Sequence, residues 1–253
     1  MPESNTPQRR SNSSGDIWVA VDYGGVLTNP IVETVAAFCS HHQLTPDTLM
    51  VAMQRAGDST NTGMALLERG EITEADFLAR VNNHLFPDGD RAITVEEFHR
   101  TWFTGRTANT PMLDALSRLP DSGVHLALVT NNVAEWRDHW HRTLGTYLNL
   151  FEVIIDSSAV GTRKPEPQIF DLVATTTGLT PSRTLFIDDD ADNITAADSA
   201  GWHTHRFIDT ASAVSAVDEF LADLTDRADR VESGDPVDRP SPSTGQSLSS
   251  ATR

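Results

Sequence analysis

The sequence is short of three things: cysteine, positive charge and long hydrophobic runs. Its one cysteine, Cys39, cannot form an intramolecular disulfide, and the helical pattern around it predicts a buried helix residue rather than a nucleophile. The sequence has 19 lysines and arginines against 36 aspartates and glutamates. The resulting net charge of −17 disfavours a surface that binds nucleic acid or an anionic membrane. No apolar run reaches the roughly 18 residues that a membrane-spanning helix needs.

The two ends of the chain contain little that a core can bury. Residues 1–15 are almost entirely polar and lack the apolar stretch of a secretory signal, and residues 227–253 are rich in Pro, Ser, Gly, Asp and Arg. We therefore expect a disordered N-terminus, a folded part over about residues 16–226 and a disordered tail. We also expect a cytoplasmic protein, a monomer or homodimer, whose partner is a small molecule rather than nucleic acid or a membrane.

Most of the folded part alternates between short apolar, β-branched runs and helical patterns. The expected strands are 17–21, 124–129, 153–155, 184–187 and 203–207. The helical patterns that separate them or follow them are 110–119, 134–144, 166–178 and 194–201. This alternation predicts an α/β fold, a Rossmann-like parallel sheet with helices on both faces.

Residues 31–108 break the alternation, because they contain several helical patterns and no strand. Thr73 and Thr94 each stand where a threonine caps the start of a helix. We therefore expect an all-helical cap domain over 31–108, inserted between two core segments, 16–30 and 109–226. Its connections to the core are expected at 27–31 and from Gly105 onward.

Polar side chains occur where four of the predicted elements meet the same edge of the sheet. They are Asp22 after the first strand, Thr130 and Asn131 after the second, Lys164 before the helix that follows the third, and Asp188, Asp189 and Asp190 after the fourth. Because ligands of open α/β sheets bind beyond the carboxyl ends of the strands, we expect these groups to converge. Each residue alone is explained equally well by an ordinary structural role, such as a turn, a helix cap or a surface lysine. Together they favour a reaction centre.

These residue types suit phosphoryl transfer. Carboxylates such as Asp22 and the Asp188–Asp189 pair are ligands for Mg²⁺, and a lysine offsets the charge of a carboxylate that faces a phosphate. Thr130 offers a hydroxyl and Asn131 a backbone N–H to a phosphate oxygen. A carboxylate can then attack phosphorus in line and form an aspartyl-phosphate that water cleaves.

The same segments resemble a known family. The stretches “DYGGVLT” (22–28), “LVTNN” (128–132), “RKPEPQIF” (163–170) and “LFIDDDADNITAADSAG” (185–201) look like the four ordered motifs of the haloacid dehalogenase superfamily. The similarity covers about residues 16–210 and is closest to members with a helical C1-type cap, the branch of sugar-phosphate phosphatases and the N-terminal phosphatase domain of soluble epoxide hydrolases.

The resemblance implies a Mg²⁺-dependent phosphomonoesterase for a small phosphorylated metabolite. Its catalytic residues would be Asp22, Lys164 and Thr130, with Thr130, Asn131 and Lys164 binding phosphate; Asp22, the backbone carbonyl of Gly24 and Asp189 would bind the metal, supported by Asp188 and Asn193. Substrate selection would fall to the cap, where the candidates are Arg55, Asn61, Met64, His84 and Trp102.

Position 24 departs from the pattern, because most phosphatases of this superfamily carry a general-acid aspartate where this chain has Gly24. Two alternatives therefore stay open: a non-hydrolytic member that binds metal and phosphate or diphosphate as a regulatory or binding module, and an interaction protein with a relic site. Dehalogenation is disfavoured. Haloacid dehalogenases carry a tyrosine two residues after the nucleophile and use no metal, whereas Tyr23 follows Asp22 directly and the acidic fourth motif is kept.

Overall fold

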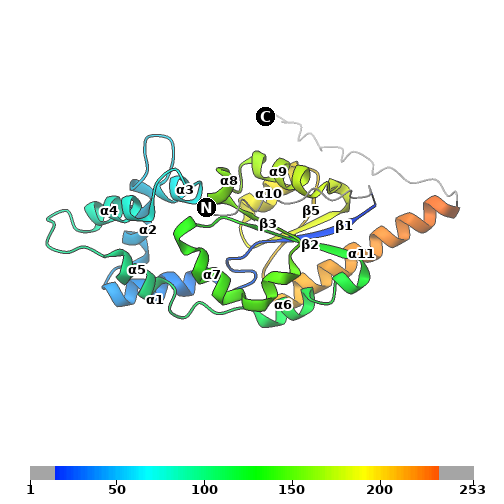
Figure 1. Ribbon diagram of the computed structural model, residues 1–253, viewed down its shortest axis with the longest axis horizontal. Coiled ribbons are helices and arrows are strands. Elements are labelled where there is room, and N and C mark those ends of the chain that lie inside the picture. Colours follow the sequence, from blue (N-terminus) through cyan, green and yellow to red (C-terminus); the bar gives the residue numbers. More distant parts are fainter. Residues whose placement is uncertain (1–14, 234–253) are drawn as a thin grey trace, which may run out of the picture.

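The computed structural model describes residues 15–233, and its centre is a five-stranded sheet in which all neighbouring strands are parallel (Figure 1). The strands are β1 (Ile17–Val21), β2 (Val124–Thr130), β3 (Val153–Asp156), β4 (Thr184–Asp188) and β5 (His203–Arg206), in the order β3-β2-β1-β4-β5. The central strand β1 pairs with β2 on one side and with β4 on the other. The predicted parallel sheet and all five of its strands are confirmed.

Helices cover both faces of the sheet, because alternate strand side chains point to opposite faces and both sets are apolar. Val19 and Val21 belong to one buried cluster, and Trp18 and Ala20 belong to another. The first cluster includes residues of α6 (Thr110–Leu116), α7 (Arg137–Leu144) and α11 (Thr210–Ser233); the second includes residues of α9 (Pro167–Thr177) and α10 (Ala191–Ser199). The short α8 (Ser157–Val160) follows β3 directly.

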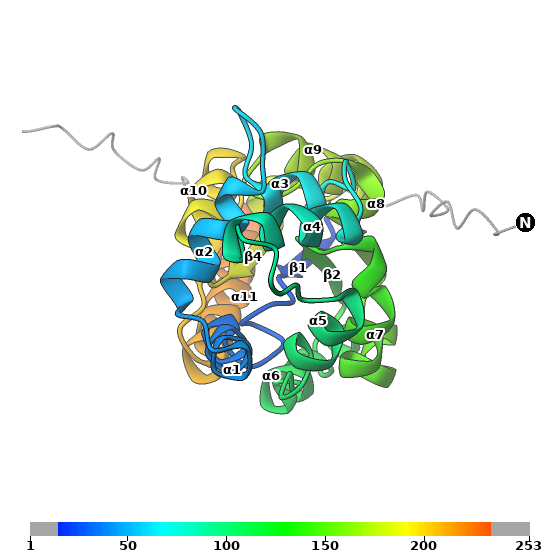
Figure 2. The same cartoon turned by 90° about the vertical axis from the view of Figure 1, so that its left-hand side faces the viewer.

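The cap is all-helical, as expected, and lies in front of the sheet when the molecule is viewed from the cap side (Figure 2). Its helices are α1 (Ile31–His42), α2 (Pro46–Arg55), α3 (Gly63–Glu68), α4 (Glu74–Leu85) and α5 (Val95–Trp102). A separate apolar cluster joins them, and it includes Cys39, the helix residue predicted to be buried. Thr73 and Thr94 cap α4 and α5 as predicted, and Thr94 forms a capping box with Glu97.

The two connections between cap and core run side by side. Thr28 and Ala108 form an isolated antiparallel bridge. The backbone N–H of Asn29 donates to the carbonyl of Thr107 at 3.1 Å, and that of Asn109 donates to the carbonyl of Leu27 at 2.9 Å. The chain therefore leaves and re-enters the core at one place, which supports the expected boundaries.

Several predicted ends were wrong. The predicted tail began at 227, but α11 continues to Ser233 and an i,i+4 pair between Asp223 and Arg227 lies on its last turns. The predicted helix at 194–201 begins at Ala191, because the Asp190 side chain accepts the N–H groups of Asp192 and Asn193. The helix predicted over 134–144 starts with a 3₁₀ turn at 134–136. The predictions for residues 1–14 and 234–253 lie outside the described residues.

Within residues 15–233 the helices do not include one long and apolar enough to cross a membrane.

Candidate active site

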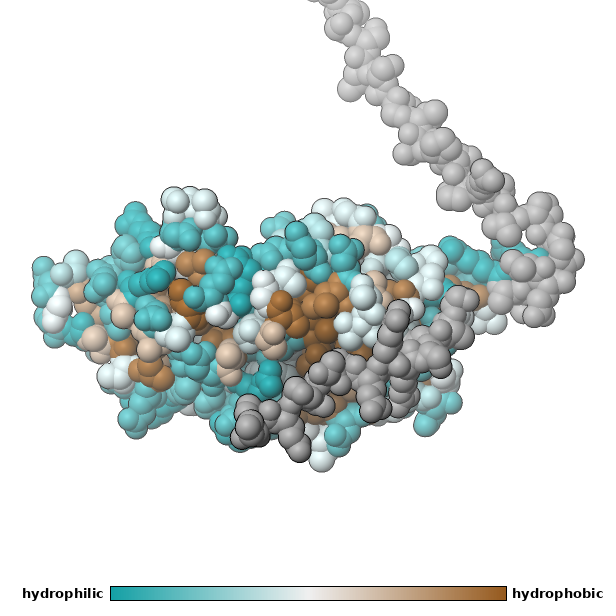
Figure 3. Space-filling view, turned by 45° about the horizontal axis from the view of Figure 1, so that its top comes forward, coloured by the Kyte–Doolittle hydropathy of each residue, from teal (hydrophilic) through white to brown (hydrophobic). Residues whose placement is uncertain are grey.

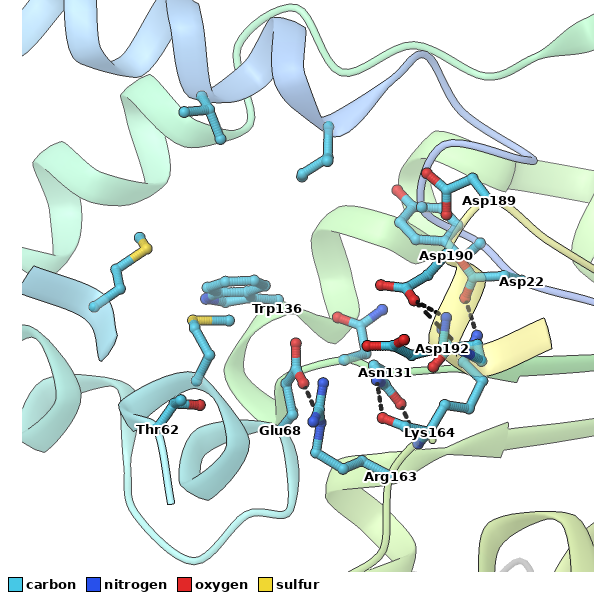
Figure 4. A pocket seen from close by; sticks show the side chains of 18 of the residues that line it. Asp22, Thr62, Glu68, Asn131, Trp136, Arg163, Lys164, Asp189, Asp190 and Asp192 are labelled. Carbon is cyan, nitrogen blue, oxygen red and sulfur yellow. Dashed lines mark hydrogen bonds and ion pairs between the residues drawn. The ribbon is translucent and has the colours of Figure 1, made fainter. Parts of the chain in front are cut away.

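Asp22 and Lys164 form the centre of the site, as the sequence predicted. Asp22 follows β1 directly, its backbone N–H donates to the carbonyl of Ile187 at 2.9 Å, and its side chain is almost buried. The ammonium group of Lys164 lies 2.5 Å from Asp22 Oδ1 and 2.7 Å from Asp188 Oδ2 (Figure 4). Lys164 is only 1% exposed and Asp188 is fully buried, so this lysine joins two carboxylates away from water.

The electrostatics of this group are dominated by an excess of carboxylate. Burial raises the pKa of Asp22 to about 7, and the nearby Asp188 adds to the effect of burial, although Lys164 opposes it. Burial, together with Asp188, also raises the pKa of Asp189. Burial alone would lower the pKa of Lys164, but Asp188 and Asp22 more than compensate and raise it. Arg106 also interacts electrostatically with Asp22 and Asp189. Three acidic side chains against Lys164 and Arg106 still leave a balance that an added cation would improve.

The same three carboxylates are close enough to share a divalent cation. One oxygen each from Asp22, Asp188 and Asp189 lie within 4.8 Å of one another. Carboxylate oxygens are the donors that Mg²⁺ takes, so the residues fit the predicted metal. The predicted ligands Asp22 and Asp189 are thus brought together, whereas the role of the Gly24 carbonyl stays a prediction.

The Asp188 carboxylate interacts with Lys164, Asn193 and the backbone N–H of Asp190. Besides Lys164, its oxygens accept the Asn193 side-chain amide at 3.0 and 3.2 Å and the backbone N–H of Asp190 at 2.9 Å. These contacts hold the carboxylate in one orientation. Asn193, the first buried polar residue of α10, therefore acts on the site through Asp188, in the supporting place predicted for it.

Asn131 holds the backbone of Lys164. Its amide oxygen accepts the backbone N–H of Lys164 at 2.8 Å, and its amide nitrogen donates to the Lys164 carbonyl at 2.8 Å. Thr130, at the end of β2, is 1% exposed and is not among the residues that line the cavity described below. Phosphate binding by Thr130 and Asn131 stays a prediction, but the structure adds a positioning contact that sequence reasoning missed.

A cavity of about 730 Å³ lies between cap and core with Asp22 in its wall. Of the five cap residues predicted to select substrate, Met64 and Trp102 line it and Arg55, Asn61 and His84 do not. The prediction was wrong for these three. Two of the side chains make contacts within the cap instead: a His84 ring nitrogen lies 3.1 Å from the carbonyl oxygen of Arg55, and the Asn61 amide donates to Thr60.

Sequence reasoning missed most of the cavity wall. The further lining residues include Ile31, Val35, Met50, Met53, Gln54, Glu68, Phe103, Arg106, Asn132, Trp136, Arg163 and Arg206. Two spacings in the sequence carry a signal, since Ile31 and Val35 are four residues apart and Met50 and Met53 are three apart, so each pair shares a helix face.

Ion pairs and hydrogen bonds connect the cap to the core beside Lys164. Arg163, the residue before Lys164, forms an ion pair with the cap residue Glu68 at 2.6 Å, and Arg69 reaches Glu166 at 2.8 Å. The Ser157 hydroxyl accepts the N–H of Asn132 and donates to the carbonyl of Glu68. These contacts connect α3 of the cap with the loops that carry Asn131 and Lys164.

Buried Glu74 makes a second connection. Its Oε1 accepts the indole N–H of Trp136 at 2.6 Å, and its Oε2 pairs with His99 at 2.8 Å. Trp136 lines the cavity and belongs to the apolar cluster of the cap. The cap therefore touches the core at a second place that borders the cavity.

This chain resembles known proteins both in sequence and in fold. Residues 18–201 match the family described as haloacid dehalogenase-like hydrolase. This chain belongs to that family. The matched segment runs from β1 to α10, so it contains the cap and every predicted site residue.

Three curated relatives are 28–30% identical to this hydrolase over the residues that align. Acyl-CoA dehydrogenase family member 10 of Mus musculus is 30% identical over 84% of this chain, and bifunctional epoxide hydrolase 2 of Rattus norvegicus is 28% identical over 79% of it. The chain spans only 20% and 38% of those two proteins. Sesquiterpene phosphatase astK of Aspergillus oryzae is 28% identical over 71% of this chain and 84% of its own length.

Solved structures share the fold. A haloacid dehalogenase family enzyme from Bacteroides thetaiotaomicron, in complex with magnesium and inorganic phosphate, superposes with a TM-score of 0.58 at 22% identity, covering 77% of this chain and 97% of its own. L-2-haloacid dehalogenase from Xanthobacter autotrophicus gives 0.56 at 16% identity, covering 76% and 77%. These two likenesses show the fold and do not by themselves distinguish one activity from another.

Proposed function

We propose that this hydrolase is a Mg²⁺-dependent phosphomonoesterase that acts through an aspartyl-phosphate at Asp22. The observation that carries the proposal is the Asp22–Lys164–Asp188 arrangement, with Asp189 beside it, in the wall of a cavity. A relative named as a phosphatase and a neighbour that holds magnesium and phosphate support it.

The chain's own residues account for nucleophilic attack. Asp22 Oδ1 accepts a hydrogen bond from Lys164, which leaves Oδ2 as the attacking oxygen. Its attack on phosphorus forms the acyl phosphate while the bond to the leaving oxygen breaks, and the leaving alkoxide takes a proton from water. Water then attacks the phosphorus of the intermediate, which releases inorganic phosphate and restores the Asp22 carboxylate.

Lys164 favours the ionised form of Asp22 against the effect of burial and holds the carboxylate in place, and Asn131 holds the lysine's backbone. Asp22, Asp188 and Asp189 are the residues that would hold Mg²⁺. When bound, the ion supplies positive charge that neutralises the phosphate oxygens and lets them approach an acidic site.

Gly24 favours one alternative, a protein that binds metal and phosphate or diphosphate without turnover. A Cβ built on Gly24 would meet only Asp22 Oδ2, at 3.8 Å, so this side of the nucleophile lacks the carboxylate that would protonate a leaving group. General acid catalysis typically contributes about 10²–10⁴ in rate. Poor leaving groups would therefore react slowly.

A panel of phosphate monoesters, assayed with and without Mg²⁺, tests the proposal. We expect Mg²⁺-dependent release of phosphate that is abolished in Asp22→Asn. Tight binding of phosphate or diphosphate without turnover would instead support the binding module. A protein indifferent to both metal and phosphate would overturn both functions.

A further inference from the structure

The cavity has two chemically different ends. The core end contains Asp22, Lys164 and Asp189. Other polar core residues also line the cavity, among them Asn131, Asp190, Asp192 and Arg206. The cap's part of the wall is mainly large and apolar, with Ile31, Val35, Met50, Met53, Met64, Trp102 and Phe103, and Trp136 after β2 adds to it. Figure 4 shows Trp136 lying away from the charged groups that surround Asp22. An apolar wall of this kind favours an apolar ligand.

The cap provides few polar groups to that wall. They are Gln54, Thr62, Glu68 and, at the return to the core, Arg106. The Thr62 hydroxyl already accepts the N–H of Ala65, and Glu68 is paired with Arg163. A substrate with many hydroxyl groups would therefore lose its hydrogen bonds to water and gain few from the cap, at a cost in binding for each group left unpaired.

The apolar wall continues to the protein surface. Ile31 on α1 and Met50 on α2 line the cavity, yet they are 42% and 46% exposed. They therefore stand where the cavity opens to water. On the face drawn in Figure 3, apolar residues in brown appear among hydrophilic ones on the cap half of the molecule. A chain that starts at Asp22 can follow apolar side chains out to this opening.

We infer that the substrate is the phosphate monoester of a long apolar alcohol, with its phosphate at Asp22 and its hydrocarbon chain along the cap toward Met50. This inference rests on the proposed phosphatase function and adds the chemical class of the leaving group. The cavity volume of about 730 Å³ lies within the range of sites that enclose a ligand of this size.

The test is a series of straight-chain alkyl phosphates from ethyl to dodecyl, with a hexose monophosphate as the polar comparison. The leaving-group pKa is nearly constant along the alkyl series, so chain length acts through binding alone. We expect kcat/KM to rise roughly two- to fourfold for each methylene that the cavity buries, and then to level off. The hexose monophosphate should react no better than the shortest alkyl ester.

Neighbouring residues offer matched controls. Val51 follows Met50 on α2 and is 43% exposed, but it does not line the cavity; Val32 stands in the same relation to Ile31 and is 66% exposed. Met50→Glu should lower kcat/KM for dodecyl phosphate by on the order of tenfold more than for ethyl phosphate, because the charge disrupts the apolar path in addition to any repulsion of the phosphate. Val51→Glu should change neither, and Ile31→Asn against Val32→Asn repeats the comparison on α1.

The outcomes separate this inference from the proposed function. Mg²⁺-dependent hydrolysis that is flat or decreasing with chain length overturns the apolar substrate and leaves the phosphatase intact. Equal effects of Met50→Glu and Val51→Glu also overturn it. If no ester is hydrolysed, the phosphatase fails, and calorimetry with alkylphosphonates of the same lengths still decides: affinity that rises with length in wild type, but not in Met50→Glu, supports the cavity, and flat affinity refutes it.

Discussion

Lys164 lies between two carboxylates that would otherwise repel each other inside the protein. The lysine contacts Asp22 at 2.5 Å and Asp188 at 2.7 Å, and both contacts are shielded from water. The two acids differ in what else they touch, since Asp188 is also bound by Asn193 and by the N–H of Asp190, while Asp22 keeps one oxygen for chemistry. The structure thus assigns different tasks to aspartates that look alike in the sequence.

Asp22→Ala and Asp189→Ala should lose activity through different steps. Removing Asp22 removes the nucleophile, so added Mg²⁺ should not restore turnover. Removing Asp189 weakens a metal site that keeps other oxygens, so raising Mg²⁺ should recover part of the rate. The measurement is the initial rate against Mg²⁺ concentration for both variants, and equal rescue of both would mean that Asp22 serves only as a ligand.

The adjacent glycines 24 and 25 should respond oppositely to substitution. Gly24 does not have a positive φ and has room for a side chain, whereas Gly25 has φ +80° and a Cβ there would lie 2.3 Å from Asp189 Oδ2. Gly24→Asp should speed esters with poor leaving groups most, by up to about 10²-fold. Gly25→Ala should lose activity, because Asp189 has to move.

Single-turnover rates for aryl and alkyl phosphates check the first half of this prediction. Wild type should show a steep fall in rate as leaving-group pKa rises, and Gly24→Asp should flatten it. Similar wild-type rates for both classes would show that another group already supplies the proton. Circular dichroism and Mg²⁺ binding of both variants serve as controls for folding.

At the scale of elements, threonine caps set where the cap helices begin. Thr45, Thr62, Thr73 and Thr94 each accept a backbone N–H from the first turn of their helix. Such local signals are readable from sequence, which explains why the starts of α4 and α5 were predicted correctly. The end of α6 was not: the predicted pattern ran to 119, but the helix ends at Leu116.

Thr94→Ala should lower the free energy of unfolding by about 1 kcal/mol, because it removes the capping box of α5. Thr175→Ala is the matched control: this exposed threonine lies inside α9, and its hydroxyl donates only to the Asp171 carbonyl of the same helix. Urea unfolding followed by circular dichroism measures both. A control as destabilised as Thr94→Ala would mean that the loss does not come from the cap.

At the scale of the whole molecule, the contacts between cap and core set the position of the cap residues that line the cavity. The ion pair between Glu68 and Arg163 joins α3 to the loop of the catalytic lysine, and the Glu68 side chain is 14% exposed against 25% for Arg163. Burial raises the pKa of Glu68, and Arg163 counters that effect. The pair therefore matters more for the position of the cap than for its net contribution to stability.

Arg163→Met should destabilise the protein by about 2 kcal/mol, less than the 3–5 kcal/mol of a fully buried pair, because it leaves Glu68 without its partner. The double variant Arg163→Met with Glu68→Leu should recover much of that stability. Both should raise KM, since α3 loses its tie to the catalytic loop. A double-mutant cycle on unfolding free energy and KM tests this, and strictly additive effects would contradict a direct coupling.

The amino-acid sequence by itself determined the parallel sheet, the helical cap and the aspartates and lysine of the site. The reason is that strand alternation, threonine caps and strand-end polar groups are local patterns, and the parallel topology then brings the strand ends together. Only the tertiary structure decided which side chains line the cavity, because Met50 and Val51 are alike in composition and exposure and differ only in the side of α2 they occupy. Tertiary structure also decided the partners of Asn131 and Glu68, because Asn131 meets Lys164 and Glu68 meets Arg163 only in the folded chain, across long stretches of sequence.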